Sequence, residues 1–249
     1  MAKMTLSLRP PPKTPGRLSQ ALTRLLMRRA SVVAVEPLAD RFRLITLKGP
    51  ALAGVSWAPG QKIQIAMGSA FVARTYTPME WDASEGLTRF LGYAHGDGPG
   101  SAWVRVIEPG DECDIFGPRG SLEVGSLTGP LAVFGDETSM GLAHAIAAVQ
   151  DRARPFTCAF EVGEIESAGL VVARLGLPDA ALFARTGDEA HLEAMADMLA
   201  PLVATGASFV LTGRASAIQR LRQGLKLHGV PPGRIATKAY WARGKVGLD

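Results

Sequence analysis

The hydrophobic rhythm of the chain changes once, near residue 125, and this change constrains the fold more than any other feature. From residue 31 onward, short runs rich in Val, Ile, Leu, Tyr and Phe alternate with turn sequences such as KGP, APGQ and EPGDE. The runs are SVVAV, RFRLITL, QKIQIAM, RTYTP, LTRFLGYA and ECDIF. Six strands at this spacing predict a small antiparallel barrel, interrupted by one helix within 98–110.

After this point the chain alternates short apolar runs with segments whose apolar residues recur at helical spacing. The runs cover 131–135, 156–162, 181–185 and 208–213, and a last run covers 235–241. This alternation predicts a doubly wound parallel sheet with helices on its faces. Pro201 interrupts the third helical segment, so we expect a kink or an early stop there.

Length and composition support two folded domains. The chain has 249 residues, of which 47% are hydrophobic and 20% charged, which excludes wholesale disorder. We expect a basic N-terminal extension (1–30), a β-barrel domain (31–125) and an α/β domain (126–249). The last strand of the α/β domain is expected to return to the barrel.

The net charge of +4 originates in the extension. The extension holds no acidic residue and seven basic ones, namely Lys3, Arg9, Lys13, Arg17, Arg24, Arg28 and Arg29. The remaining residues carry 20 basic and 23 acidic side chains, so a nucleic-acid-binding body is not indicated. We expect a solvated tail that ends in a short basic helix over 18–29; a role in recruiting anions is the alternative.

Membrane and metal sites are not indicated either. No apolar run approaches the roughly 18 residues of a membrane helix, and no secretory signal core is present, so we expect a cytoplasmic protein without membrane insertion. Cys113 and Cys158 form no CxxC pair, and the four histidines lack metal-ligand spacing.

Three short motifs stand out. In RTYTP (74–78), Arg74 and Tyr76 share one face of a strand, where an arginine can clamp a phosphate while the aromatic ring covers a flat ligand. In HGDGPGSAW (95–103), a glycine-rich turn opens a helix, which suits a pyrophosphate. Taken singly, the first motif is typical of a cross-strand surface pair, and the second of a tight turn with Ser101 as a cap.

The third motif, FGDETSMGLAHA (134–145), joins the first strand of the α/β half to its first helix. A doubly wound sheet binds nucleotides at this place, yet GxGxxG is absent. Asp136 and Glu137 would repel a pyrophosphate if they pointed into the loop, while Thr138 and Ser139 are of the types that cap helices.

In combination these motifs are specific. RTYT, HGDGPGSAW, FGPRGS (116–121), GDET (135–138) and YWARG (240–244) occur in this order, and together they resemble the siderophore-interacting protein family of FAD-dependent ferric-siderophore reductases. The resemblance covers about 31–249 and implies the ferredoxin-reductase-like architecture, with FAD on the barrel and NADPH or NADH on the α/β half. It implies electron transfer from the nicotinamide through FAD to Fe(III) in a siderophore, which releases Fe(II).

The resemblance also implies the site residues. Arg74 should contact the FAD pyrophosphate, Tyr76 should lie against the isoalloxazine, and Thr77 and Thr138 should lie near the reacting rings; no side chain need act as nucleophile or acid. The expected cofactor-binding residues are Arg74, Tyr76, Thr77, His95, Gly98, Pro99, Ser101, Arg119, Gly120, Asp136, Thr138, Arg185, Arg214 and Trp241. The chain departs from the family at Ser139, at Arg214 and at Ala242, which bears on substrate and cofactor preference.

Basic residues near the C-terminus are candidates for substrate binding. Lys238, Arg243 and Lys245 could attract an anionic ferric siderophore, or else be the solvated charges of an edge strand. Arg185 and Arg214 end consecutive strands where an adenosine ribose would lie, which favours NADPH over NADH unless Arg185 pairs with Asp188 or Glu189. The oligomeric expectation is a monomer.

Two rival functions remain open at this point. One is another flavin enzyme on the same scaffold, such as a ferredoxin, flavodoxin or free-flavin reductase. The other is a non-catalytic module that binds flavin or siderophore.

Overall fold

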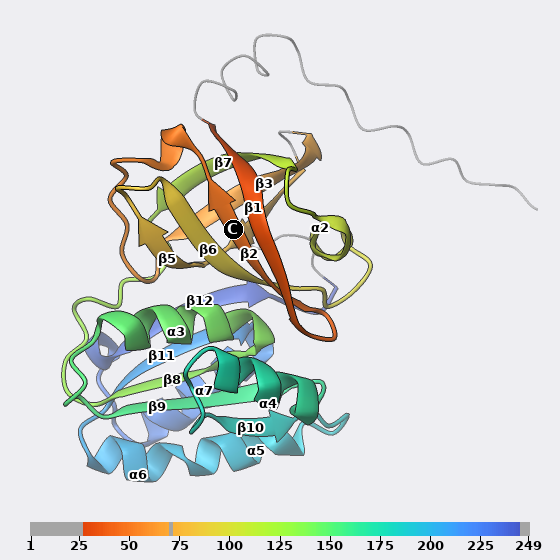
Figure 1. The fold of residues 1–249 in the computed structure, drawn as a ribbon. Helices are drawn as coiled ribbons and strands as arrows, with labels where there is room; N and C mark the ends of the chain where they lie inside the picture. The colour runs from red at the N-terminus through yellow and green to blue at the C-terminus, as the bar shows by residue number, and fades with distance from the viewer. Residues whose placement is uncertain (1–26, 70–71, 245–249) are drawn as a thin grey trace, which may run out of the picture.

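The computed structural model describes residues 27–69 and 72–244, which form two stacked halves (Figure 1). The first half is an antiparallel β-sheet with one helix, and the second is a parallel β-sheet covered by helices on both faces. The predicted fold class, an antiparallel β-barrel domain followed by a doubly wound parallel-sheet domain, is confirmed, except that the two end strands of the antiparallel sheet do not pair with each other in the described residues to close the barrel.

The first half contains seven strands among the described residues rather than the predicted six. They are β1 (Arg28–Ala39), β2 (Phe42–Lys48), β3 (Lys62–Ser69), β4 (Val72–Tyr76), β5 (Pro78–Asp82), β6 (Leu87–Tyr93) and β7 (Glu112–Arg119). The order is β4-β3-β7-β1-β2-β6-β5. RTYTP does not form one strand: β4 pairs with β3 and β5 with β6, so the chain changes neighbours at Thr77. Pro78 has no N–H to donate, which suits the first residue of a strand.

The sheet curls around a core to which both ends contribute. The rings of Tyr76 on β4 and Phe90 on β6 lie 4.8 Å apart, and Ile45, Ile63 and Ile115 are fully buried between them and the other strands. Helix α2 (Pro99–Val106) covers one opening of this curl and lies within the predicted range 98–110.

The second half has the predicted succession of strands and helices. The strands are β8 (Leu131–Asp136), β9 (Phe156–Val162), β10 (Ala181–Ala184), β11 (Ser208–Arg214) and β12 (Ile235–Trp241), all parallel, in the order β10-β9-β8-β11-β12. The helices are α3 (Met140–Val149), α4 (Ile165–Arg174), α5 (Ala190–Asp197), α6 (Leu199–Ala204) and α7 (Ala215–Leu227). Helices α3 and α4 cover one face, and α5 to α7 the other (Figure 1). The predicted break near Pro201 is confirmed, because α5 ends and α6 places this proline in its first turn.

The expected basic helix over 18–29 is wrong at its C-terminal end. Arg28 and Arg29 belong to β1, where their backbone pairs with β7. The guanidinium of Arg28 also donates to the carbonyls of Gly117 (3.2 Å) and Ala51 (2.8 Å), so this arginine is tied to the sheet. The rest of the extension lies outside the described residues.

A single hydrophobic cluster joins the two halves. Phe42, Leu44 and Met79 of the β half belong to the same buried cluster as Met140 and Leu142 of α3. A Cβ at Gly141 would lie 3.2 Å from Cγ of Met79, which shows how closely α3 approaches β5. The relative position of the halves therefore rests on buried apolar contact.

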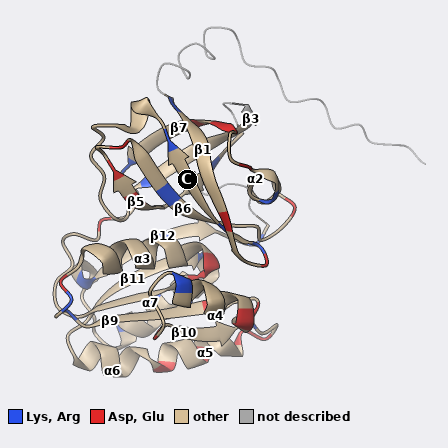
Figure 2. Ribbon diagram, in the orientation of Figure 1, with Lys and Arg blue, Asp and Glu red and all other residues tan. Residues whose placement is uncertain are grey.

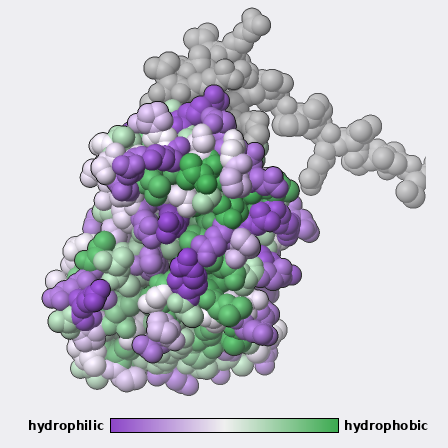
Figure 3. Space-filling view, viewed as in Figure 1, coloured by the Kyte–Doolittle hydropathy of each residue, from purple (hydrophilic) through white to green (hydrophobic). Residues whose placement is uncertain are grey.

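The outer surface is mixed in character. Lys and Arg are interspersed with Asp and Glu over both halves (Figure 2), and the face in Figure 3 mixes hydrophilic and hydrophobic residues. The exposed large apolar residues are spread over β1 and four helices, a scattered pattern that is ordinary for a protein surface. They are Val33, Val106, Val149, Ile165, Leu170 and Leu227. No helix in the described part of the chain is long and apolar enough to span a membrane.

Candidate functional site

The glycine-rich turn before α2 leaves backbone donors exposed. Gly98 is the N-cap residue, and the first bond within the helix runs from Ala102 N–H to Gly98 O (3.0 Å). The N–H groups of Gly100 and Ser101 precede this bond and point out of the helix end. Ser101 is not the cap, since its Oγ accepts a hydrogen bond from Gly96 N–H (3.2 Å) and so shapes the turn.

Arg74 lies directly beside this helix end. A Cβ at Gly100 would lie 3.0 Å from Cγ of Arg74, so any larger residue would require the Arg74 side chain to move away. The guanidinium donates to Ala73 O (2.8 Å), and Arg74 pairs with no carboxylate of the described residues. A cation beside free helix N–H groups is a donor set that fits the pyrophosphate of a dinucleotide such as FAD.

Tyr76 reaches the same glycine and continues into the core. Its hydroxyl lies 3.5 Å from Gly100 O, and its ring packs against Phe90 and Trp103, with centroids 4.8 and 5.7 Å away. Burial raises the pKa of this phenol, which therefore stays protonated. Arg74 and Tyr76 thus meet at Gly100, but the placement of Tyr76 against a flavin ring stays a prediction.

Thr77 lies between β4 and β5 and faces the second half. Its hydroxyl is 3.5 Å from the hydroxyl of Tyr240 on β12, and burial raises the pKa of Tyr240 to about 12. Sequence reasoning missed Tyr240 as a site residue. Its place beside Trp241 on the expected returning strand was the available signal.

Asp136 and Trp241 form the centre of the junction between the halves, which we call the seam. The indole N–H of Trp241 donates to Oδ2 of Asp136 (2.7 Å), and its ring stacks on His95 with centroids 6.2 Å apart. Asp136 Oδ1 accepts from Thr138 N–H (2.9 Å) and from the Thr138 hydroxyl. Asp136 is fully buried, and this burial raises the pKa of its carboxyl to about 6.

Glu137 also turns inward instead of facing a ligand. Its Oε1 accepts from Gly163 N–H (2.7 Å) and from the Tyr93 hydroxyl (3.1 Å), which belongs to the β half. Arg185 donates to both oxygens of Glu137, through Nη1 at 3.0 Å and through Nη2. The predicted alternative for Arg185, a pair with Asp188 or Glu189, is therefore not the arrangement observed.

Arg214 is buried in a second ionic group. Its Nε and Nη2 donate to Glu161 at 2.8 and 2.6 Å, its Nη1 donates to Glu189, and only 2% of its side chain is exposed. His191 Nδ1 accepts from Thr186 N–H (3.1 Å), so its Nε2–H donates to Glu161 (2.8 Å). Burial raises the pKa of Glu161, but the hydrogen bonds from Arg214 and His191 outweigh it and hold this pKa below its usual range.

The expectation that Arg214 meets a 2′-phosphate is wrong for this arrangement. A guanidinium that is buried and paired with two carboxylates is not available to a ligand. Sequence reasoning missed Glu161 and His191 because both look like ordinary residues at a strand end and a helix start.

The remaining predicted residues lie around the edge of this region. Arg119 stacks on Phe116 (4.2 Å from the ring centroid) and donates to Gln64, while its Nε is buried without a partner in the described chain. Lys238 is half-buried on β12, and Arg243 is exposed near Glu189. Lys245 lies outside the described residues.

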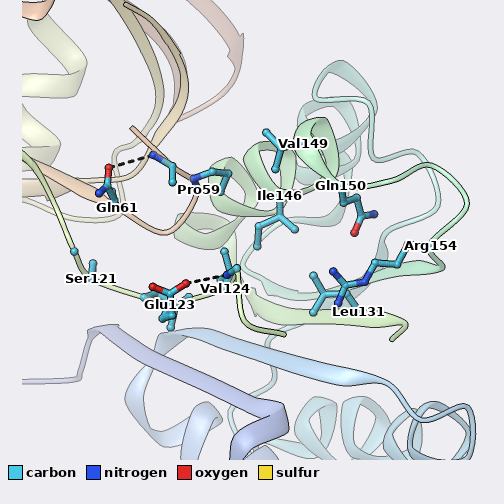
Figure 4. A pocket seen from close by; sticks show the side chains of 14 residues that line it. Pro59, Gln61, Ser121, Glu123, Val124, Leu131, Ile146, Val149, Gln150 and Arg154 are labelled. Carbon is cyan, nitrogen blue, oxygen red and sulfur yellow. Dashed lines mark hydrogen bonds between the residues drawn. The ribbon is translucent and has the colours of Figure 1, made fainter. Parts of the chain in front are cut away.

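A separate cavity lies near the amino ends of the parallel strands (Figure 4). It measures about 540 Å³, and Pro59, Leu131 and Ile146 line it together with Gln150 and Arg154. Of the predicted site residues only Gly120 borders it. The cavity therefore lies between the two halves as well, but at the amino ends of the parallel strands, away from Asp136 and Trp241 at their carboxyl ends.

Comparison with protein families identifies the segment that carries the seam residues of the β half. Residues 68–122 match the model of the siderophore-interacting FAD-binding domain, and this segment includes β4 to β6, α2 and β7. The resemblance to the siderophore-interacting proteins is confirmed, and the matched residues 68–122 are similar to the FAD-binding domain of that family. Comparison with curated proteins gives no match.

Solved structures share the whole fold. A siderophore utilization protein from T. fusca is 24% identical, with a TM-score of 0.72 over 90% of this chain and 95% of that chain. The siderophore-interacting protein SipS from Aeromonas hydrophila is 23% identical, with a TM-score of 0.73 over 88% and 93%. The ferredoxin reductase in carbazole 1,9a-dioxygenase is 17% identical, with a TM-score of 0.69 over 86% and 69%. At these identities the likeness shows a ferredoxin-reductase-like fold.

Proposed function

We propose that the protein is a flavin-dependent reductase that takes electrons from a nicotinamide dinucleotide and passes them to Fe(III) held by a siderophore. The observation that carries this proposal is the position of the matched segment. Its Arg74 and the free N–H groups of α2 lie beside the seam, opposite the carboxyl ends of the parallel strands. Parallel sheets of this kind bind dinucleotides at those ends.

When bound, FAD supplies the conversion of a two-electron hydride donor into one-electron steps for iron. The task of the chain is placement. Arg74 and the α2 turn, with Gly98, Pro99 and Ser101, hold the pyrophosphate, while Tyr76 and Thr77 lie on the segment that meets the flavin ring. Arg119, the last residue of β7, and Gly120 after it would lie near the adenosine half of the bound FAD.

The second half shapes the other side of the seam. The hydrogen bond from Trp241 to Asp136 and the stack on His95 fix an aromatic wall there. Thr138 holds Asp136 in place, and Tyr240 faces Thr77. In this proposal no side chain acts as nucleophile or general acid.

The substrate would approach from the solvent side. Ferric siderophores are bulky and often anionic, and exposed cations raise the rate at which anions arrive. Lys238 and Arg243, with Lys245, are the residues that we assign to this role. In this scheme residues 31–125 form the flavin domain and 126–249 the nicotinamide domain.

The test uses purified full-length protein loaded with FAD. Under anaerobic conditions, NADH or NADPH should bleach the flavin absorbance, and ferric siderophores should restore it while a ferrous chelator reports Fe(II). Parallel reactions contain ferredoxin, flavodoxin or free FMN. Faster reoxidation by one of these than by every ferric siderophore would overturn the proposal, as would a flavin that neither nucleotide reduces.

A further inference from the structure

The carboxyl edge of the parallel sheet, where the proposed function places the nicotinamide dinucleotide, carries two arginines that are already paired. Arg214 is buried between Glu161 and Glu189, and Arg185 is held by both oxygens of Glu137. The guanidinium of Arg185 also lies 5.9 Å from the Trp241 ring, which turns it toward the seam. Arg185 is therefore directed toward the seam, and Arg214 reaches the turn after β10 only through its ion pair with Glu189.

The turn between β10 and α5, which we call the rim, presents two carboxylates. Asp188 accepts a hydrogen bond from Ala190 N–H (3.2 Å), and a hydrogen bond from Thr186 lowers its pKa. Glu189 adopts φ of +61°, a rare conformation outside glycine, and 42% of its side chain is exposed although it contacts Arg214. The pair with Arg214 lowers the pKa of Glu189. Both groups are therefore ionised acceptors at neutral pH.

The charge balance of this edge is negative. Glu137 pairs with Arg185, Glu161 and Glu189 pair with Arg214, and Asp188 adds an exposed carboxylate. The exposed Arg243 is a further cation whose charge acts on Glu189. A ribose diol can donate hydrogen bonds to carboxylates, whereas a 2′-phosphate has no such donor and adds negative charge. In sheets that bind NAD, a carboxylate beyond the end of a strand commonly accepts a hydrogen bond from the ribose 2′-hydroxyl.

We propose that the nucleotide taken by this protein is NADH rather than NADPH, and that Asp188 and Glu189 select it by accepting the hydroxyl groups of the adenosine ribose. This inference rests on the proposed function, and it reverses the preference that the arginines indicate in the sequence.

Binding can be tested without turnover. FAD-loaded protein is titrated with ADP-ribose and with 2′-phospho-ADP-ribose, and the heat of binding is measured by calorimetry. We expect ADP-ribose to bind about tenfold tighter or more, which corresponds to about 1.4 kcal/mol. Equal or tighter binding of the phosphorylated analogue would overturn the proposal, and Arg243→Ala would then show whether Arg243 binds the phosphate. Absence of binding by both analogues at millimolar concentration would overturn it too.

Variants locate the selectivity. Combined Asp188→Asn and Glu189→Gln should weaken ADP-ribose binding and bring the two affinities close together. Glu193→Gln is the matched control, because Glu193 is an exposed acid in the first turn of α5, just after Asp188 and Glu189, and it pairs with Arg220. An unchanged preference in the double variant contradicts the assignment of these carboxylates. The proposed function is tested separately, by mixing chemically reduced enzyme with a ferric siderophore and no nucleotide.

Discussion

The indole of Trp241 and the carboxylate of Asp136 join the end of β12 to the end of β8 through a 2.7 Å hydrogen bond. This bond lies in a space that only a glycine leaves open, because a Cβ at Gly213 would come within 2.4 Å of Oδ2 of Asp136. The carboxylate is completely buried and receives its hydrogen bonds from Thr138 and Trp241. The charge state of Asp136 therefore affects the stability of the protein and the hydrogen bond that joins β8 to β12 at the seam.

Asp136 should make the protein less stable as the pH rises from about 4 to about 6. Its folded-state pKa of about 6 lies above the ordinary value of 3.8, so between these values the folded state binds more protons than the unfolded state. The loss amounts to as much as about 3 kcal/mol. Denaturant unfolding of the wild type and of Asp136→Asn across this range measures it, since the variant cannot titrate. A constant difference between the two proteins would contradict the prediction.

Arg74→Ala should yield largely colourless protein. Each hydrogen bond from the guanidinium to a pyrophosphate oxygen is worth about 1.5–3 kcal/mol, so the loss of one weakens FAD binding roughly tenfold to a hundredfold. The ratio of visible flavin absorbance to protein absorbance after purification measures occupancy. Arg89→Ala is a suitable control, because Arg89 lies on β6 and pairs with Glu80. Full occupancy in Arg74→Ala would remove this arginine from the flavin site.

Trp241→Phe and Trp241→Ala should separate the hydrogen bond from the aromatic ring. Phenylalanine keeps a ring beside His95 but cannot donate to Asp136, whereas alanine removes both contacts. We expect flavin fluorescence and siderophore reduction to change together in the alanine variant, with a smaller change in the phenylalanine variant. If both properties stay at wild-type values in Trp241→Ala, the tryptophan serves packing alone.

Gly213→Ala should destabilise the protein more than Gly206→Ala. Both glycines have positive φ, +93° and +78°, so both variants bear the backbone cost of about 1 kcal/mol. A new Cβ at Gly206 meets no atom within 4 Å, whereas one at Gly213 collides with Asp136. We expect a further loss of about 1–3 kcal/mol at Gly213. Equal unfolding free energies for the two variants would show that the Asp136 side chain can move aside.

The succession of elements was predictable because it depends on local periodicity, but the partners of polar residues were not. The sequence RTYTP predicts one strand. In the structure it is divided at Thr77, because β4 pairs with β3 and β5 pairs with β6. The local sequence assigns Arg28 to a charged tail, because its pairing with β7 involves residues far along the chain.

The candidate site shows the same division. The turn at Gly98 and the nearby Arg74 were predictable from composition and order. The partners of Glu161 are His191 and Arg214, 30 and 53 residues further along the chain, and no local pattern reports such a contact. The same holds for Glu137 and Arg185, which are 48 residues apart.

The hydrophobic cluster shared by Met79 and α3 bears on whether the two halves can be produced as separate fragments. A cut between residues 120 and 130 would expose apolar surface on both fragments. We therefore expect each fragment to aggregate when it is produced alone. Grafting a different α/β half onto this β half would require matching Phe42, Leu44 and Met79 to the new helix, because a mismatched graft would leave voids or overlaps at the junction of the two halves.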